Sequence, residues 1–166
     1  MLLERMPFMG HARDLHNMSM LQQHSGINLV FPSESFAVRK ALKSLMGGLH
    51  HLQLSDETLS IAEIVIAEAL NNVVEHAYGE NALGVIEVKM RKQDDQLWVQ
   101  IIDDGRAMPG DQLPPGAAHD LDTCQEDLPE GGFGWNMIRE LTDDLQYKRQ
   151  DNQNRLTFSL PIKTTQ

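Results

Sequence analysis

The 166-residue sequence contains one cysteine, Cys124, which excludes a disulfide framework within the chain. It has no apolar run approaching the ~20 residues that a membrane-spanning helix needs. Its first residues also lack the continuous apolar stretch of a secretory signal peptide. These absences predict a soluble protein in the reducing cytoplasm, with no membrane partner.

Basic residues are scarce. Lysine and arginine together number 14 against 24 aspartates and glutamates, which gives a formal net charge of −10. An acidic surface repels the phosphate backbone of nucleic acids. The charge balance therefore argues against DNA or RNA as a direct partner.

Two familiar phosphate-binding motifs are also missing. The turn Gly131-Gly132-Phe133-Gly134 is not followed by the Lys-Ser/Thr pair of a Walker A loop. Nor does it follow the first strand of a βαβ unit, as a dinucleotide-binding fingerprint would. The turn does open a predicted helix, and the free N–H groups of a helix N-terminus can hold phosphate. Alternatively, it is a flexible loop that leads into a helix.

The length fits one domain, and 41% apolar with 23% charged residues is typical of a globular protein. Helical periodicity predicts helices from Ser33 or Ser35 to Gly47-Gly48, from Ser55 to His76 and from Gly134 to Asp144. Alternating patterns predict strands at 27–31, 84–92, 97–102, 145–149 and 155–160, with turns at 93–96 and 151–154. The order predicts an α+β two-layer sandwich, with helices on one face of a mostly antiparallel sheet.

The second predicted helix carries an acid and an amide one turn apart. Glu68 and Asn72 continue a stripe that begins with Ile61 and Val65, beside an apolar stripe that should face the core. A carboxylate at the margin of a core is unfavourable unless it is paired or has a function. The alternative is a helix edge that simply turns toward solvent.

A strand ending in an acidic turn follows. After Ile101-Ile102 the chain reads Asp103-Asp104-Gly105. A carboxylate at a strand end can accept a hydrogen bond from an exocyclic amine such as that of adenine. The glycine would let a planar base approach the backbone. The alternative is an ordinary exit from a strand into a turn.

Taken in order, E-x-x-x-N on a helix, D-x-G at a strand end and G-G-x-G opening a later helix resemble the GHKL ATPase/kinase superfamily. The resemblance spans roughly residues 27–162 and implies its Bergerat-type ATP-binding fold. EALNNVVEHAY is similar to the N-box, particularly that of the bacterial anti-sigma-factor serine kinases. The implied organisation is an N-terminal arm at 1–25 and a kinase domain at 26–164, with an ATP lid at 106–130.

The resemblance implies a role for each matching residue. Asn72 would coordinate Mg²⁺, and Glu68 would act as general base on the attacking hydroxyl. Asp103 would bind the adenine amine, with Gly105 beside it. Four further positions are implied: Gly132 and Gly134 as phosphate contacts, Thr157 on the adenine side and His76 in a supporting role.

The function implied is an ATP-dependent serine protein kinase and anti-sigma factor. Its partner would be a STAS-domain anti-anti-sigma protein, with a sigma factor and a second copy of the chain as further candidates. One alternative is a non-catalytic ATP-binding module that sequesters a sigma factor or another regulator. Another is the ATPase core of a detached sensor kinase. Glu68 favours the kinase, because a sequestering module would not need it.

Overall fold

The computed structural model describes residues 26–79, 83–114 and 132–163. The predicted arm at 1–25 and the lid residues 115–130, which include Cys124, lie outside the described residues. The strands are β1 (Ile27–Pro32), β2 (Val85–Gln93), β3 (Gln96–Asp103), β4 (Asp143–Gln150) and β5 (Gln153–Pro161). The helices are α2 (Ser35–Leu49), α3 (Asp56–Asn72), the π-helix η3 (Val73–Tyr78) and α4 (Gly132–Leu141), with short 3₁₀ turns η2 (His50–Leu52) and η4 (Pro109–Asp111).

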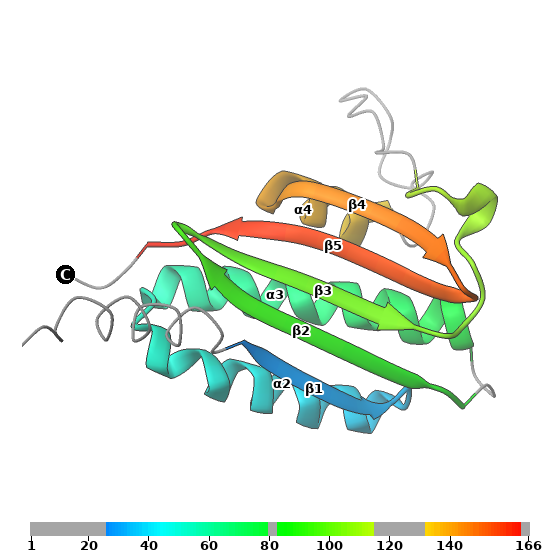
Figure 1. The fold of residues 1–166 in the computed structure, drawn as a ribbon, viewed down its shortest axis with the longest axis horizontal. Coiled ribbons are helices and arrows are strands. Elements are labelled where there is room, and N and C mark those ends of the chain that lie inside the picture. The colour runs from blue at the N-terminus through cyan, green and yellow to red at the C-terminus, as the bar shows by residue number, and fades with distance from the viewer. Residues whose placement is uncertain (1–25, 80–82, 115–131, 164–166) are drawn as a thin grey trace, which may run out of the picture.

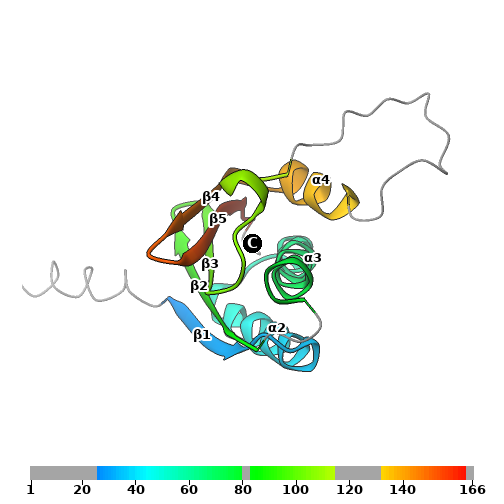
Figure 2. The same ribbon diagram turned by 90° about the vertical axis from the view of Figure 1, so that its right-hand side faces the viewer.

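The strands form one antiparallel sheet in the order β1-β2-β3-β5-β4 (Figure 1). Helices α2, α3 and α4 lie on the same face of this sheet (Figure 2). Alternate strand residues such as Val88, Val99 and Phe158 point into the core between the two layers, where Ile66 of α3 meets them. The predicted two-layer α+β sandwich is confirmed. No helix of the described residues has the length and apolar content to cross a bilayer.

Helix α2 differs from its prediction at both ends. Its N-cap is Glu34, not Ser33 or Ser35, because the Ser33 hydroxyl instead accepts a hydrogen bond from Gly84 N–H (2.9 Å). The helix also continues through Gly47-Gly48 to Leu49. Gly48 packs against β1, where a Cβ would come within 2.8 Å of Ile27 Cδ1, so close packing explains the glycine better than helix termination.

The predicted start of α3 is confirmed, since Ser55 accepts a hydrogen bond from Thr58 N–H (3.2 Å) as an N-cap. The C-terminal part of the chain differs in detail. Helix α4 ends at Leu141 and β4 already begins at Asp143, so the predicted helix to Asp144 is too long. The last turn is only Asp151-Asn152, both with positive φ, as tight hairpin turns require. Residue 154 therefore belongs to strand β5.

Candidate functional site

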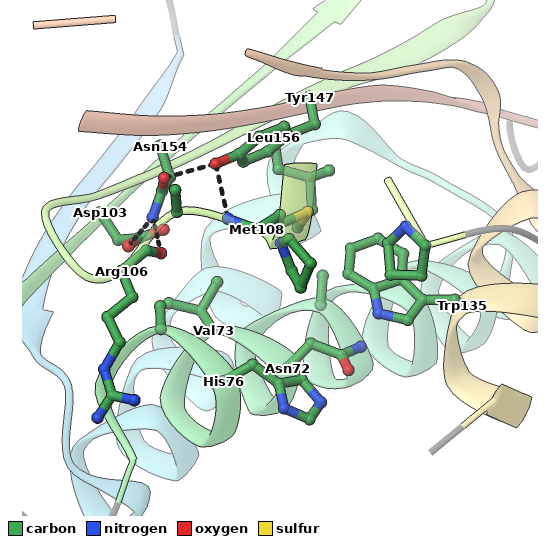
Figure 3. Close-up of a pocket in the computed structure, with 15 residues that line it drawn as sticks. Asn72, Val73, His76, Asp103, Arg106, Met108, Trp135, Tyr147, Asn154 and Leu156 are labelled. Atoms are coloured by element: carbon green, nitrogen blue, oxygen red, sulfur yellow. Dashed lines mark hydrogen bonds between the residues drawn. The ribbon is translucent and has the colours of Figure 1, made fainter. Parts of the chain in front are cut away.

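A cavity of about 570 Å³ lies between the helical layer and the sheet. Figure 3 shows Asn72 and His76 on its helical side, and Asp103, Asn154 and Tyr147 on its strand side. Most of the wall is apolar, with side chains that include Ala69, Val73, Met108, Trp135 and Leu156. An apolar cleft with a few convergent polar groups is the usual form of a small-molecule site.

Asn72 is 9% exposed and its amide is oriented by its own helix. Its Nδ2 donates to the backbone carbonyl of Glu68 (2.9 Å), one turn earlier. This bond leaves Oδ1 without a donor among the described residues. A buried amide oxygen at the cavity wall is the type of ligand that Mg²⁺ accepts, so the residue present fits the cation.

The half-buried Glu68 side chain reaches across to the start of α4. A Cβ placed on Gly134 would overlap the Glu68 carboxyl group. The glycine therefore makes room for that carboxylate, a role that the sequence did not reveal. Gly132 and Gly134 lie in the first turn of α4, where backbone N–H groups have no partner within the helix. The structure thus brings Glu68, Asn72 and this helix start together.

Asp103 lies at the other end of the cavity and is 5% exposed. Its Oδ1 accepts hydrogen bonds from Gly105 N–H (2.9 Å) and from Asn154 Nδ2 (2.7 Å). Burial raises the pKa of Asp103, because a carboxylate loses its hydration there, while these two donors act in the opposite direction. Asn154 is itself 4% exposed and lines the cavity.

Gly105 is needed for packing and is not among the residues that line the cavity. A Cβ at this position would come within 2.7 Å of the Ala77 carbonyl oxygen on η3. The next residue, Arg106, donates its backbone N–H to that same oxygen (2.8 Å). The glycine thus lets the turn after β3 rest directly on the helix.

Tyr78 fixes the same turn from the other side. Its hydroxyl group bonds to the Asp104 carboxylate and to the Val85 carbonyl (3.0 Å), and it accepts a hydrogen bond from Asp104 N–H (3.1 Å). Burial, aided by the Asp104 bond, raises the pKa of Tyr78, and the Tyr78 hydrogen bond lowers the pKa of Asp104. The strand end that presents Asp103 is therefore held in place before any ligand binds.

Thr157 does not reach the cavity. Strand side chains alternate between the two faces of a sheet, and Asn154, Leu156 and Phe158 point toward the helices. Thr157 points to the opposite face, where it lines a separate hollow with Trp98. Thr157, which the resemblance put on the adenine side, does not line this cavity, and Asn154 occupies the place beside Asp103. Extending the alternation of Leu156 and Phe158 back by one step would have found it.

The described part of the predicted lid, residues 106–114, forms one wall of the cavity. Met108 N–H donates to the Tyr147 hydroxyl of β4 (3.1 Å), and Arg139 of α4 donates to the Pro114 carbonyl oxygen. Met108 and Pro114 both line the cavity. Tyr147 and Arg139 were not identified from the sequence, because only the folded chain brings near the backbone atoms of Met108 and Pro114 that they contact.

Residues 31–160 match the profile of the histidine kinase-like ATPase domain. This chain belongs to that family. The match covers every strand and helix that lines the cavity, except for Pro161 at the end of β5. The resemblance drawn from the N-box, D-x-G and G-G-x-G segments is confirmed.

The chain is also similar to individual proteins that are named as serine-protein kinases. The chain is 27% identical over 132 residues to the serine-protein kinase RsbW of Oceanobacillus iheyensis, covering 78% of this chain and 83% of that protein. It is also 27% identical over 128 residues to RsbW of Bacillus cereus, covering 76% of this chain and 79% of that one.

A solved structure agrees on the fold. A crystal structure of the RsbU and RsbW domains of a Mycobacterium tuberculosis protein superposes with a TM-score of 0.55 at 14% identity. The match covers 85% of this chain but only 34% of that longer one. This histidine kinase-like ATPase domain therefore has the fold of an RsbW domain.

Proposed function

We propose that this chain is an ATP-dependent serine protein kinase and anti-sigma factor. A serine protein kinase is in line with the name of its RsbW relatives. The substrate would be a serine of a STAS-type anti-anti-sigma protein, as the resemblance implies. The observation that best supports this is the convergence of Glu68, Asn72 and the N-terminus of α4 at one place. A carboxylate base, a cation ligand and phosphate-binding N–H groups are the parts that phosphoryl transfer needs.

In the proposed reaction, the serine oxygen forms a bond to the γ-phosphorus of ATP. The bond from that phosphorus to its bridging oxygen breaks, and ADP leaves. Glu68 accepts the hydroxyl proton as general base. The N–H groups of the first turn of α4 stabilise charge on the phosphate oxygens.

Asn72 would hold Mg²⁺ through Oδ1, and the cation would neutralise the phosphate charge. Asp103 would accept from the adenine amine at the far end of the cavity. Figure 3 shows Asp103 and Asn72 at separate places around the cavity, with Trp135 of α4 on the Asn72 side. The nucleotide would therefore lie with its base at Asp103 and its phosphates toward α4.

The direct test combines the chain with γ-labelled ATP, Mg²⁺ and a STAS-domain protein encoded in the same genome. We expect label on one serine of the STAS protein, and none when that serine is replaced by alanine. Tight ATP binding without transfer to any STAS protein would favour the sequestering module instead. Failure to bind ATP would contradict both functions.

A further inference from the structure

Four polar side chains from three strands form a connected cluster at the Asp103 end of the cavity, and three of them line it. We call them the Asn154 cluster: Asp103 of β3, Tyr147 and Arg149 of β4, and Asn154 of β5. Asn154 lies at its centre. Its Oδ1 accepts from the Tyr147 hydroxyl (2.7 Å) and from Arg149 Nη1 (2.6 Å). Its Nδ2 donates to Asp103 Oδ1 (2.7 Å) and to the Arg106 carbonyl oxygen (2.8 Å).

The groups that contact the Asn154 cluster determine which atom is the donor in each of its hydrogen bonds. Met108 N–H can only donate, so the Tyr147 oxygen accepts from it (3.1 Å) and sends its own proton to Asn154. The Arg149 guanidinium can also only donate. Two donors on one side of the amide, and the Arg106 carbonyl on the other, allow one orientation of Asn154. Its NH₂ group must face Asp103.

This orientation of Asn154 determines which oxygen of Asp103 is left to accept a hydrogen bond from a ligand. Oδ1 already accepts two hydrogen bonds, from Gly105 N–H and Asn154 Nδ2. No donor among the described residues reaches Oδ2. Because donors stabilise the ionised carboxylate, Asn154 opposes the effect of burial at this site. The free oxygen is then an acceptor that a ligand must satisfy with a donor.

We infer that Asn154, oriented by Tyr147 and Arg149, is a specificity-determining residue that keeps Asp103 an acceptor. The site thereby selects a nucleobase with an exocyclic amine over one with a carbonyl group in the same place. A carbonyl facing Oδ2 would set two acceptors against each other in a buried space. The inference rests on the proposed nucleotide site but does not depend on phosphoryl transfer.

The test is the ratio of ATP to inosine triphosphate affinity, measured by calorimetry with Mg²⁺. Inosine triphosphate has a carbonyl in place of the amine at position 6 of the base and, with it, an N–H in place of the acceptor nitrogen at position 1. We expect the parent to prefer ATP by about tenfold or more. Asn154→Asp keeps the shape but puts a second carboxyl group beside Asp103, and two carboxyl groups this close cannot both ionise. Asp103 then no longer acts only as an acceptor, so this preference should fall several-fold. Asn154→Leu removes the amide and should also lower the preference for ATP. The two variants test the same point, so one remains informative if the other folds poorly.

Two further variants serve as controls. Tyr147→Phe removes one of the two donors that orient the amide, and it should lower the ratio less than Asn154→Asp because Arg149 remains. Thr157→Val lies on the same strand but points to the other face of the sheet, and it should leave the ratio unchanged.

The outcomes separate this inference from the proposed function. If Asn154→Asp weakens both nucleotides equally, Asn154 only holds the strands together and the inference is wrong. If the parent binds ATP and inosine triphosphate equally well, the site does not distinguish the amine from the carbonyl and the inference is wrong. The proposed kinase function would not be contradicted by that result. If the parent binds neither nucleotide, the proposed function itself fails.

Discussion

At the residue scale, Asn72 donates its Nδ2 to the Glu68 backbone carbonyl, and no donor from the described part of the chain reaches its Oδ1. We predict that Asn72→Ala loses the Mg²⁺-dependent part of ATP affinity, roughly tenfold or more, because the cation loses a ligand. Calorimetry with and without Mg²⁺ measures this difference. Asn71→Ala on the exposed side of the same helix is the matched control. A variant that keeps the parent's response to Mg²⁺ would contradict the role of Asn72.

A pH dependence follows from Asp103, whose pKa is raised by burial. The ionised form is the acceptor, so ATP affinity is present above this pKa and is lost as pH falls through it. The ratio of ATP to inosine triphosphate affinity isolates the effect, because the nucleotide phosphates titrate alike. In the Asp103→Asn variant this ratio should not change with pH. A variant whose ratio depends on pH in the same way as that of the parent would contradict the prediction. The titratable groups near Asp103 are Asp104, Arg106, Tyr78, Tyr147, Arg149 and His76.

At the element scale, the turn after β3 rests on η3 through Gly105. We predict that Gly105→Ala destabilises the fold by about 1–3 kcal/mol, because its Cβ meets backbone atoms of Ala77 that cannot easily move. Gly47→Ala in α2 is the matched control, because nothing lies within 4 Å of its Cβ. It should stabilise the helix by about 0.5–1 kcal/mol. Chemical denaturation measures both, and equal effects would contradict the packing explanation.

Sequence periodicity predicted most elements, because buried strands such as β2 alternate and α3 has an apolar stripe. The resemblance of the N-box and D-x-G segments to the family implied Asn72 and Asp103 as site residues, and both line the cavity. The Asn154 cluster was missed. Residue 154 was assigned to a turn, although the turn ends at Asn152, and the role of Tyr147 depends on a backbone N–H that folding brings near.

At the scale of the whole molecule, one ligand would contact both layers of the sandwich. The cavity is lined by α3, the start of α4, and strands β3, β4 and β5. We predict that saturating Mg-ATP, at about 100 times its Kd, stabilises the fold by about 2.7 kcal/mol. For a chain of this size the Tm should rise by roughly 5–10 °C. Thermal unfolding followed by circular dichroism checks this, and an unchanged Tm would mean that the cavity does not bind ATP.

The central claim is that Glu68 is the base for transfer to a partner's serine. Its carboxylate lies over Gly134 and one turn from Asn72, so Glu68→Gln keeps the shape and removes only the basicity. The decisive measurement is the rate of phosphate transfer to the STAS protein at saturating Mg-ATP, for the parent and for Glu68→Gln. We predict ATP affinity close to that of the parent and a rate lower by about 10²–10⁴-fold. A Glu68→Gln rate equal to that of the parent would contradict the account.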